Sequence, residues 1–172
     1  PGMFSVYNSL CAIAICSHFT ENVEKIQTAL ENVKVKGRVE IIPISKRFTL
    51  MIDYAHNAMS LESLLTSLKQ YNPSRLSDFT IVTSDNPRFE EPMDIINDIL
   101  VGVKKADGEY VTVPDRKDAI RYAILNAKDG DVIILAGKGH EDYQEIKGVK
   151  HPMDERVLIK EIMEEDQVKA IL

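Results

Sequence analysis

Two short polar clusters follow apolar segments of the chain and could bind a small charged ligand. Residues 84–88 (Ser-Asp-Asn-Pro-Arg) come directly after the apolar run 79–83. Pro87 disfavours helical geometry at Asn86, so we expect a turn that holds an anion, an amide and a cation together. A zwitterionic amino acid needs such a set, because its ammonium pairs with a carboxylate and its carboxylate pairs with a guanidinium. Taken alone, these residues also fit an ordinary Asx turn.

The second cluster, residues 136–142, follows the apolar run 131–135. Gly137 and Gly139 lie on either side of Lys138 and allow the backbone to approach a ligand closely. The spacing differs from the phosphate loop G-x-x-x-x-G-K-[ST], and no Ser or Thr follows Lys138, so this segment is not an ATPase loop. Glu141 could pair with a ligand ammonium. The alternative interpretation is a glycine turn whose charges are solvated.

A third cluster, Asp53 to Asn57, ends the apolar run 48–52. Asp53 could accept a hydrogen bond from a ribose hydroxyl, and His56 could stack on a base, although a His in this position also fits a solvated or structural role. The carboxyl ends of parallel strands meet at one edge of a sheet, where open α/β sheets bind their ligands. The three clusters together therefore predict one binding site.

The elements that must position these clusters alternate between strand-like and helix-like periodicity from residue 48 onward. We expect strands at 38–42, 48–52, 79–83, 110–113 and 131–135, the last of them fully buried, and helices at 5–19, 21–33, 60–70, 93–103, 115–127 and 154–165. Lys147-Gly148 is expected to turn a hairpin, and charged residues 115–118 are expected to form a capped, solvated helix start. The alternation predicts an α/β fold, a Rossmann-like, open, mainly parallel sheet with helices on both faces.

Composition restricts the function classes. The 172 residues suffice for one sizeable core. A net charge of −6 and an aromatic content of 6% argue against a nucleic-acid surface, and no apolar run approaches the roughly 18 residues that span a membrane. Cys11 and Cys16 are expected to be buried free thiols, as in a reduced compartment, and no Cys/His spacing indicates a zinc site. No secretory signal is recognisable. We therefore expect a cytoplasmic protein. Pro1 is not an initiator residue, so we expect the sequence to begin within a longer protein.

The motifs together resemble the C-terminal domain of the MurE branch of the Mur ligase family. They are 53–56 (Asp-Tyr-Ala-His), 83–88 (Thr-Ser-Asp-Asn-Pro-Arg), 115–116 (Asp-Arg) and 137–144 (Gly-Lys-Gly-His-Glu-Asp-Tyr-Gln). Residues 2–8 are similar to the end of the family's central domain, and residues 37–40 to its junction with the C-terminal domain. The resemblance implies that 1–36 are a helical remnant of the central ATP-binding domain and 37–172 the C-terminal amino-acid-binding domain.

The resemblance implies an ATP- and Mg²⁺-dependent ligase of peptidoglycan synthesis and cell-wall biogenesis. Such an enzyme forms an amide bond through an acyl phosphate, joining meso-diaminopimelate to UDP-N-acetylmuramoyl-L-alanyl-D-glutamate (the UDP-MurNAc-dipeptide). Lysine lacks the second carboxylate that the guanidinium of Arg88 would meet, so Arg88 favours diaminopimelate. By motif position, meso-diaminopimelate would be held by Asp85, Asn86, Arg88, Gly137 and Glu141, and ATP by Asn8, Arg38, Asp53 and His56.

Two departures from the family pattern bear on the function. The phosphate loop, the magnesium ligands and the UDP-sugar domain are absent, so no catalytic or metal-binding residue is expected in this chain, which alone should be inactive. Arg75 is followed after three residues by the strand at Phe79, where the family has a further strand, a Gly-rich loop with an arginine, and a helix. Loss of an internal strand would leave a gap in a parallel sheet, so we favour residues missing from the sequence over a true deletion.

Other interpretations stay open at this point. An L-lysine-adding Mur ligase or a folylpolyglutamate synthetase-like domain would have a similar fold. A non-catalytic module that binds an amino acid or a nucleotide would explain the absent phosphate loop. A response-regulator-like interaction domain also has acids at strand ends, but it gives the segment 137–141 no role.

Overall fold

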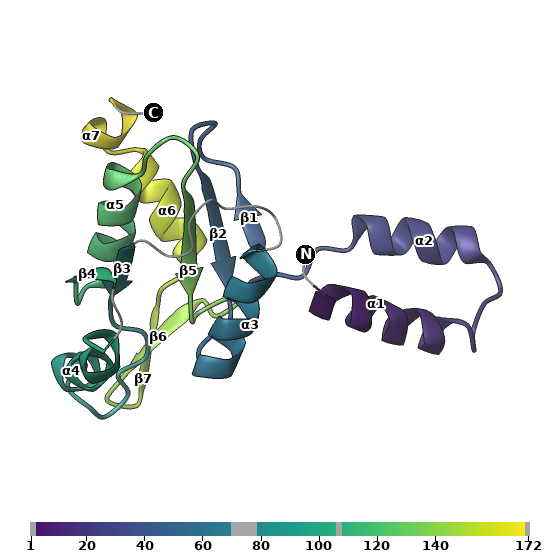
Figure 1. Ribbon diagram of the computed structural model, residues 1–172, viewed down its shortest axis with the longest axis horizontal. Coiled ribbons are helices and arrows are strands. Elements are labelled where there is room, and N and C mark those ends of the chain that lie inside the picture. The colour runs from purple at the N-terminus through teal and green to yellow at the C-terminus, as the bar shows by residue number, and fades with distance from the viewer. Residues whose placement is uncertain (1–2, 70–78, 106–107, 171–172) are drawn as a thin grey trace.

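The computed structural model describes residues 3–69, 79–105 and 108–170, and it shows a helical hairpin that projects from an α/β body (Figure 1). The helices are α1 (Met3–Cys16), α2 (Val23–Asn32), α3 (Ala58–Lys69), α4 (Pro92–Val103), α5 (Arg116–Asn126), α6 (Glu155–Met163) and α7 (Asp166–Lys169). The strands are β1 (Glu40–Ile42), β2 (Thr49–Asp53), β3 (Phe79–Val82), β4 (Glu109–Thr112), β5 (Val132–Ala136), β6 (Tyr143–Ile146) and β7 (Val149–Pro152). The projecting hairpin consists of α1 and α2.

The strands of the body form a three-stranded sheet, a parallel pair and a β-hairpin. In the first sheet, β2 pairs in parallel with β5, from Thr49 opposite Val132 to Asp53 opposite Ala136, and β1 pairs antiparallel with the other edge of β2. β3 and β4 form the parallel pair, and β6 and β7 the antiparallel hairpin. Because β2 and β5 run in the same direction in this register, the segments after Asp53 and Ala136 leave the sheet at the same edge.

The expected α/β class is confirmed, but the parallel strands are not one continuous sheet. β5 and β3 each stand at the end of their sheet, and the described residues supply no strand between them. Helix α5 contacts both strands, so it spans the two sheets. This break corresponds to the gap expected where the family pattern loses a strand. The linker residues 70–78, on which that expectation rests, lie outside the described residues.

Most expected elements form within a few residues of their predicted bounds. Asp115 caps α5 as expected, since its side chain accepts a hydrogen bond of 2.9 Å from the Asp118 N–H. The hairpin turn is confirmed: Lys147 and Gly148 have φ values of 50° and 77°, the left-handed backbone that two-residue hairpin turns require. The expected helix at 154–165 forms as α6, and the short helix α7, which was not predicted, follows it.

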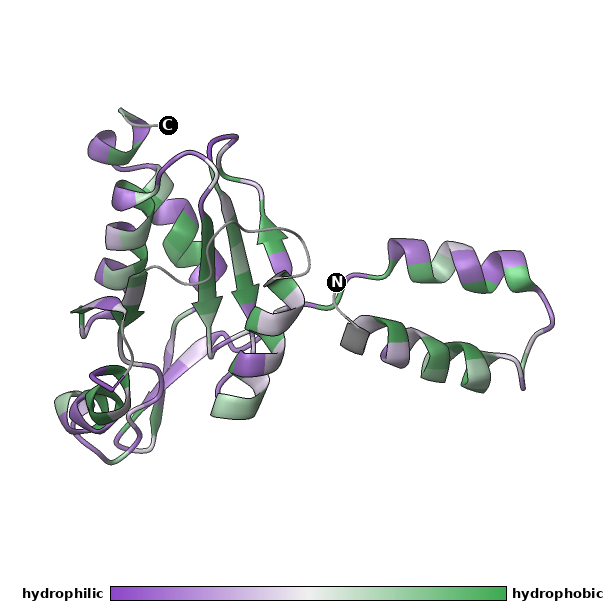
Figure 2. Cartoon of the chain, viewed as in Figure 1, coloured by the Kyte–Doolittle hydropathy of each residue, from purple (hydrophilic) through white to green (hydrophobic). Residues whose placement is uncertain are grey.

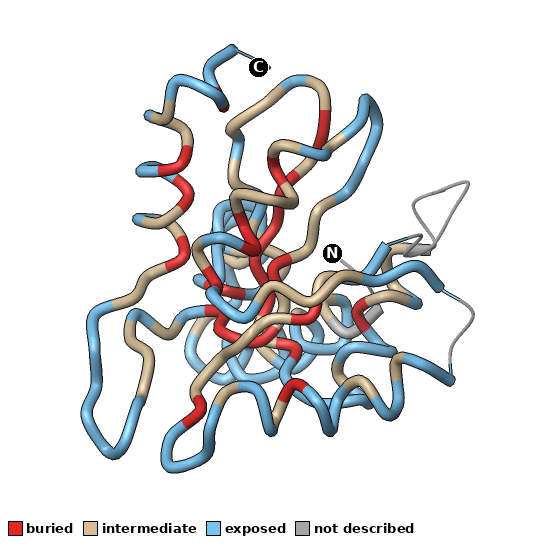
Figure 3. The backbone as a smooth tube through the Cα atoms, turned by 90° about the vertical axis from the view of Figure 1, so that its left-hand side faces the viewer, coloured by how far each residue is buried: buried red, intermediate tan, exposed pale blue. Residues whose placement is uncertain are grey.

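The main core fills the space between the β2–β5 sheet and helices α5 and α6. Ile120 and Ile124 lie four residues apart on α5, and Ile159 and Ile162 three apart on α6, so each pair occupies one helix face. Leu50 and Ile52 of β2 complete this cluster, together with neighbouring apolar residues. Met51 points to the opposite face and is also buried, so both faces of β2 are covered. Burying each such side chain contributes about 1.5–3 kcal/mol. Figure 3 shows the buried stretches of the chain gathered in the body.

Two burial predictions are wrong. The strand 131–135 is not fully buried: Val132 is 49% exposed, because β5 is an edge strand among the described residues. Cys11 and Cys16 are free but exposed. Helix α1 is rich in apolar residues (Figure 2), yet it packs against α2 of the projecting hairpin and not against the body. Its apolar side chains, including Leu10 at 56% exposure, therefore stay accessible.

Candidate functional site

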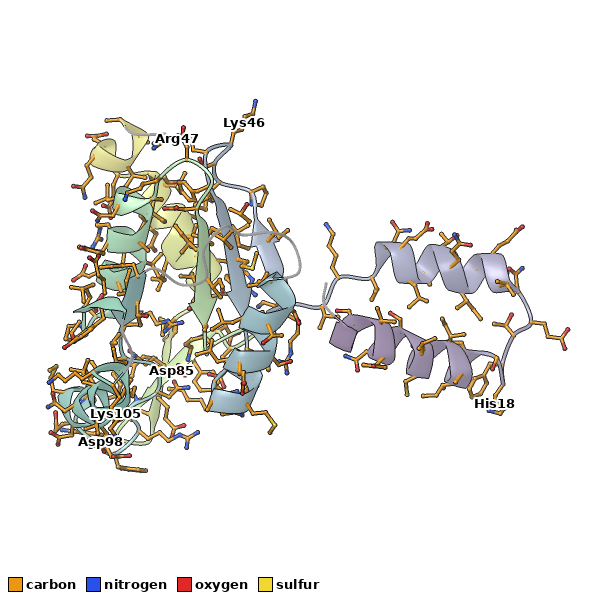
Figure 4. All side chains as sticks on the ribbon, viewed as in Figure 1. His18, Lys46, Arg47, Asp85, Asp98 and Lys105 are labelled. Carbon is orange, nitrogen blue, oxygen red and sulfur yellow. The ribbon has the colours of Figure 1, made fainter. Side chains whose placement is uncertain are left out.

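Backbone contacts bring the three polar clusters to one place. The Gly137 N–H, directly after β5, donates a 3.0 Å hydrogen bond to the Asp53 carbonyl at the end of β2. Gly137 has φ of 116°, and a Cβ atom at this position would come 3.4 Å from Asp85 Oδ2. Asp85 follows β3 of the other sheet, and Figure 4 labels it where the chain approaches the β6–β7 hairpin. The break between the sheets therefore does not separate the clusters.

Lys138 is the centre of the cluster that resembles a diaminopimelate site. Its side chain is 0% exposed, although the sequence left open whether this charge is solvated. Its ammonium donates hydrogen bonds to Asn86 Oδ1 (3.1 Å), to Glu141 Oε2 (3.0 Å) and to the Tyr143 carbonyl. Asp85 Oδ1 lies 3.3 Å from the same nitrogen. One buried cation thus joins the two predicted carboxylates and the predicted amide.

The turn after β3 is fixed to β6 by its side chains. Asn86 Nδ2 donates to Glu141 Oε2 at 2.9 Å, while Asn86 Oδ1 also accepts from the Glu145 N–H at 2.9 Å. Gln144 Nε2 donates to the Asp85 carbonyl at 2.7 Å. The side-chain amide of Asn86 therefore links the turn to Glu141 and to β6. These hydrogen bonds distinguish the turn from an Asx turn whose side chains are solvated.

Arg88 combines an unusual backbone with an available cation. Its φ is 53°, the left-handed region that non-glycine residues adopt only when the surroundings enforce it. Two backbone hydrogen bonds enforce it here: the Arg88 N–H donates to the Glu145 carbonyl at 2.9 Å, and the Lys147 N–H donates to the Arg88 carbonyl at 2.5 Å. Its exposed guanidinium makes no hydrogen bond or ion pair within the described part of the chain. The turn that carries Asp85 and Asn86 thus also carries an exposed, unpaired cation.

One carboxylate of this cluster, that of Glu141, is held as an anion. Burial would raise the pKa of Glu141, but hydrogen bonds from Lys138 and Asn86 outweigh it and leave that pKa below its usual range. Asp85 Oδ1 is buried and accepts no hydrogen bond from the described residues, since the ammonium of Lys138 directs its donors elsewhere. This arrangement suits an ammonium group at the carboxylates and a carboxylate at Arg88.

At Arg116 the structure contradicts the prediction that the charged residues at the start of this helix are solvated. Its side chain is 7% exposed, and it donates from Nε (2.8 Å) and Nη2 (2.5 Å) to Oε1 of Glu155, which is 0% exposed. Arg116 Nη2 also donates to the Ala136 carbonyl at 2.8 Å, which fixes the end of β5. Burial raises the pKa of Glu155. The sequence did not indicate that Glu155 is buried and paired with Arg116, because charged residues at a helix start normally belong to a solvated cap.

Two of the four predicted nucleotide residues, Arg38 and His56, lie beside the ring of Tyr54. The Arg38 guanidinium lies 5.0 Å from the Tyr54 ring centroid, and the His56 ring lies 4.6 Å from it. His140, which the sequence did not single out for this cluster, lies 5.0 Å from the same ring. The structure therefore brings Arg38 and His56 together. Asn8 is exposed on α1, in the projecting hairpin, and the described contacts do not join it to them.

Asp53 is 5% exposed and takes part in the backbone of this region. Its Oδ1 accepts from the Ala55 N–H and its Oδ2 from the Val39 N–H, each at 2.8 Å. Val39 has φ of 46°, so Asp53 stabilises the strained turn that carries Arg38. Each carboxylate oxygen has capacity for a further hydrogen bond, so the predicted ribose contact stays a prediction.

The turn before β1 packs directly on the loop after β5. A Cβ atom at Gly37 would lie 2.1 Å from the Gly139 carbonyl carbon. Arg156 of α6 holds the two segments together: it donates to the Gly139 carbonyl at 3.1 Å and to the carboxylate of Glu40. Arg156 also pairs with Asp154 at 3.0 Å. The sequence held no signal for Arg156, since its partners come from distant segments.

No helix of the described residues is long and apolar enough to cross a membrane. Within the same residues, no three His, Cys, Asp or Glu side chains gather as a metal site.

Comparison with known proteins identifies relatives of this chain. A family model described as "Mur ligase, glutamate ligase domain" matches residues 73–139. A UDP-N-acetylmuramoyl-L-alanyl-D-glutamate–2,6-diaminopimelate ligase of Caldanaerobacter subterraneus is 41% identical over 192 positions, which cover 97% of this chain and 40% of the relative. The ligase of the same name from Aquifex aeolicus is 40% identical over 187 positions, covering 94% and 38%. The chain thus spans about two fifths of these relatives. Both alignments are longer than the chain itself, which has 172 residues, so the relatives contain positions that this chain lacks.

Solved structures agree with these relatives. A structure of a UDP-N-acetylmuramoyl-L-alanyl-D-glutamate–2,6-diaminopimelate ligase superposes with a TM-score of 0.67 at 27% identity, over 99% of this chain and 39% of that one. A UDP-N-acetylmuramate-alanine ligase from Thermotoga maritima gives a TM-score of 0.63 at 19% identity, over 83% and 35%, and indicates a shared fold. The motifs, their geometry and these similarities agree: the chain carries a Mur ligase C-terminal domain and is similar, over nearly its whole length, to part of the relatives named as 2,6-diaminopimelate ligases.

Proposed function

We propose that this chain is the amino-acid-binding part of an ATP-dependent ligase that adds meso-diaminopimelate to UDP-N-acetylmuramoyl-L-alanyl-D-glutamate. The observation that carries the proposal is the turn at 85–88. Its backbone is strained at Arg88 and fixed to β6, and the turn carries both the unpaired guanidinium of Arg88 and the carboxylate of Asp85, which shares the ammonium of Lys138 with Glu141. Backbone strain of this kind costs on the order of 1–3 kcal/mol and persists mostly at functional sites.

The charges of the site match the distal end of meso-diaminopimelate. The ammonium of that end would meet Asp85 and Glu141, and its carboxylate would meet Arg88. Gly137 lets the backbone of the loop come close to the ligand, since it adopts φ of 116° without a side chain. Asn86 would act by holding Glu141 and Lys138 in place. L-Lysine would satisfy the carboxylates but leave Arg88 without its partner.

The Tyr54 cluster supports an ATP-facing role for the same edge of the domain. Arg38 would present a fixed positive charge to the nucleotide, and His56 would present an aromatic ring. The carboxylate of Asp53 has lone pairs that could accept a hydrogen bond from a ribose hydroxyl. Asn8 would contact adenine from the hairpin. When bound, ATP would activate the substrate carboxylate as an acyl phosphate, with Mg²⁺ balancing the phosphate charge. The phosphate groups, the Mg²⁺ ion and the UDP-MurNAc-dipeptide would be held mainly by parts of the ligase outside this sequence.

The division of the chain follows from this assignment. We infer that residues 1–36, which include the projecting hairpin, end the central ATP-binding domain, and that residues 37–172 form the C-terminal domain. The contacts of Gly37 with Gly139 support a boundary at this turn. An ATP-consuming reaction on a UDP-linked precursor would take place in the cytoplasm.

The test is a ligation assay with the full-length ligase that contains this chain. Product formation from ATP, UDP-MurNAc-dipeptide and either meso-diaminopimelate or L-lysine would be followed by mass spectrometry. We expect a much higher kcat/KM for meso-diaminopimelate. Preference for L-lysine, or ligation of glutamate to a folate, would contradict the proposed substrate. Binding without any ligation would support a non-catalytic binding module instead.

A further inference from the structure

Lys138 is a fully buried cation whose donors are all in use. An ammonium group has three donors. Those of Lys138 go to Asn86 Oδ1, Glu141 Oε2 and the Tyr143 carbonyl, and the Tyr143 ring lies 5.3 Å from the nitrogen. Lys138 therefore has no donor left for a ligand, and its 0% exposure keeps it out of reach.

Without Lys138 the two carboxylates would repel each other. Asp85 Oδ1 lies 3.3 Å and Glu141 Oε2 3.0 Å from the same nitrogen, so both anions contact one cation. Two carboxylates that share a site do not both ionise freely, and one of them takes up a proton at a raised pKa.

The surrounding charges do not replace this cation. On the α5–α6 side, Arg116 is engaged with Glu155, and the Glu155 carboxylate itself acts on Asp85. On the β6–β7 side, Lys150 lies over the outer part of the cluster, 3.8 Å from the Tyr143 ring centroid. His140, the neighbour of Glu141 in the loop, also acts on that carboxylate. The guanidinium of Arg88 is exposed and makes no ion pair with either carboxylate in the described part of the chain, so it does not take the place of Lys138.

We propose that Lys138 is a positioning residue that keeps Asp85 and Glu141 ionised and side by side, so that together they accept the ammonium of the amino-acid substrate. The three charges sum to one net negative charge, which one ligand ammonium neutralises. This inference rests on the proposed function and assigns to Lys138 a role that is distinct from direct ligand or phosphate binding.

The test in the ligase is Lys138→Met, which keeps an unbranched side chain one atom shorter than lysine and removes the charge. In this variant a proton and the ligand ammonium compete for the same carboxylate. We expect KM for meso-diaminopimelate to rise on the order of tenfold or more, as for a lost charge-assisted hydrogen bond. This KM should also fall as pH rises from about 5 to 8, the range of a carboxylate with a raised pKa, whereas wild-type KM stays flat. KM for ATP should change little. Lys160→Met is the matched control, because Lys160 is an exposed residue of α6.

A second measurement does not need the enzymatic reaction. In the 172-residue chain, the side-chain carboxyl carbons of Asp85 and Glu141 can be titrated by NMR. We expect Glu141 to titrate below its usual range in the wild type, and one of the two carboxyl groups to titrate above its usual range in Lys138→Met. If this variant does not fold, Lys138→Met combined with Glu141→Gln removes the repulsion, and Asp85 should then titrate in its usual range.

The outcomes separate this proposal from the proposed function. A wild-type ligase that does not use meso-diaminopimelate refutes the proposed function, and the NMR titration then decides the role of Lys138 in holding the carboxylates. An active ligase whose Lys138→Met variant keeps a flat, unchanged KM overturns the positioning role. An equal rise in KM for meso-diaminopimelate and for ATP, without a new pH dependence, also overturns it, because such a result indicates general structural damage.

Discussion

Arg116 and Glu155 form a buried ion pair, with 2.8 Å between Arg116 Nε and Glu155 Oε1, that joins α5 to the first turn of α6. Both side chains are almost inaccessible, at 7% and 0% exposure. Arg116 also fixes the last carbonyl of β5, directly before the Gly137 loop. The pair therefore connects the packing of the core helices to the geometry of the candidate site.

Removing one partner of this pair should be strongly destabilising. Glu155→Leu leaves the guanidinium of Arg116 buried without a countercharge, and we expect the free energy of unfolding to fall by about 3–5 kcal/mol. Arg116→Met combined with Glu155→Leu removes both charges and should recover much of this loss. Urea unfolding of the three proteins, followed by circular dichroism, measures the effect. A double variant no more stable than Glu155→Leu would show that the pair contributes more than charge compensation.

Arg88→Ala in the full-length ligase should impair the use of meso-diaminopimelate selectively. The bound ligand would shield this pair from water, and loss of a charge-assisted pair in such a site costs about 2–5 kcal/mol, so KM for meso-diaminopimelate should rise strongly while KM for ATP changes little. L-Lysine should be affected far less, since it has no second carboxylate. Lys105→Ala, which removes an exposed cation just after α4, is the control. An equal loss for the two amino acids would mean that Arg88 serves only the structure of the turn.

The backbone of Arg88 predicts a difference between two substitutions. Glycine adopts a φ of 53° without strain, whereas alanine keeps the steric cost. Arg88→Gly should therefore be more stable than Arg88→Ala by about 1 kcal/mol, although both lose the guanidinium. Thermal unfolding of the 172-residue chain would measure this difference. Equal stabilities would contradict a strained backbone at Arg88.

Gly37 should tolerate no side chain. A Cβ atom there would lie 2.1 Å from the Gly139 carbonyl carbon, and φ is 70°, so Gly37→Ala must displace backbone and not merely a flexible side chain. We expect a loss of at least about 2 kcal/mol in the free energy of unfolding. Gly102→Ala is the matched control, because nothing lies within 4 Å of a Cβ atom at that position. A Gly37→Ala variant as stable as this control would contradict the close packing of the two turns.

The Arg121–Glu165 pair predicts a pH dependence of stability. Hydrogen bonds from Arg121 lower the pKa of Glu165 from 4.5 to about 2. A lowered pKa in the folded state means that this stabilisation is complete above about pH 4.5 and is lost as pH falls toward 2. The difference in urea midpoint between the wild type and Glu165→Gln should therefore shrink over that range. The adjacent, exposed Glu164→Gln should show no such trend.

Much of the architecture could be predicted because it depends on local order along the chain. Apolar runs of period two and apolar spacings of period 3.6 indicate which segments can bury one face, and Lys147-Gly148 specifies its turn through a local backbone preference. Three polar clusters after three such strands predicted one ligand site, and the contacts among Asp53, Gly137 and Asp85 bring those clusters together.

Tertiary structure alone decided which charges are buried and what they contact. Lys138, Arg116 and Glu155 look like ordinary solvated residues in sequence, but segments from other sheets and helices cover them and supply their partners. The same holds for exposure: Cys11 lies in an apolar stretch, yet it is accessible because α1 packs against α2 and not against the body. Periodicity reports which face of an element is apolar, whereas burial depends on which distant segment reaches that face, and only the folded chain contains that information.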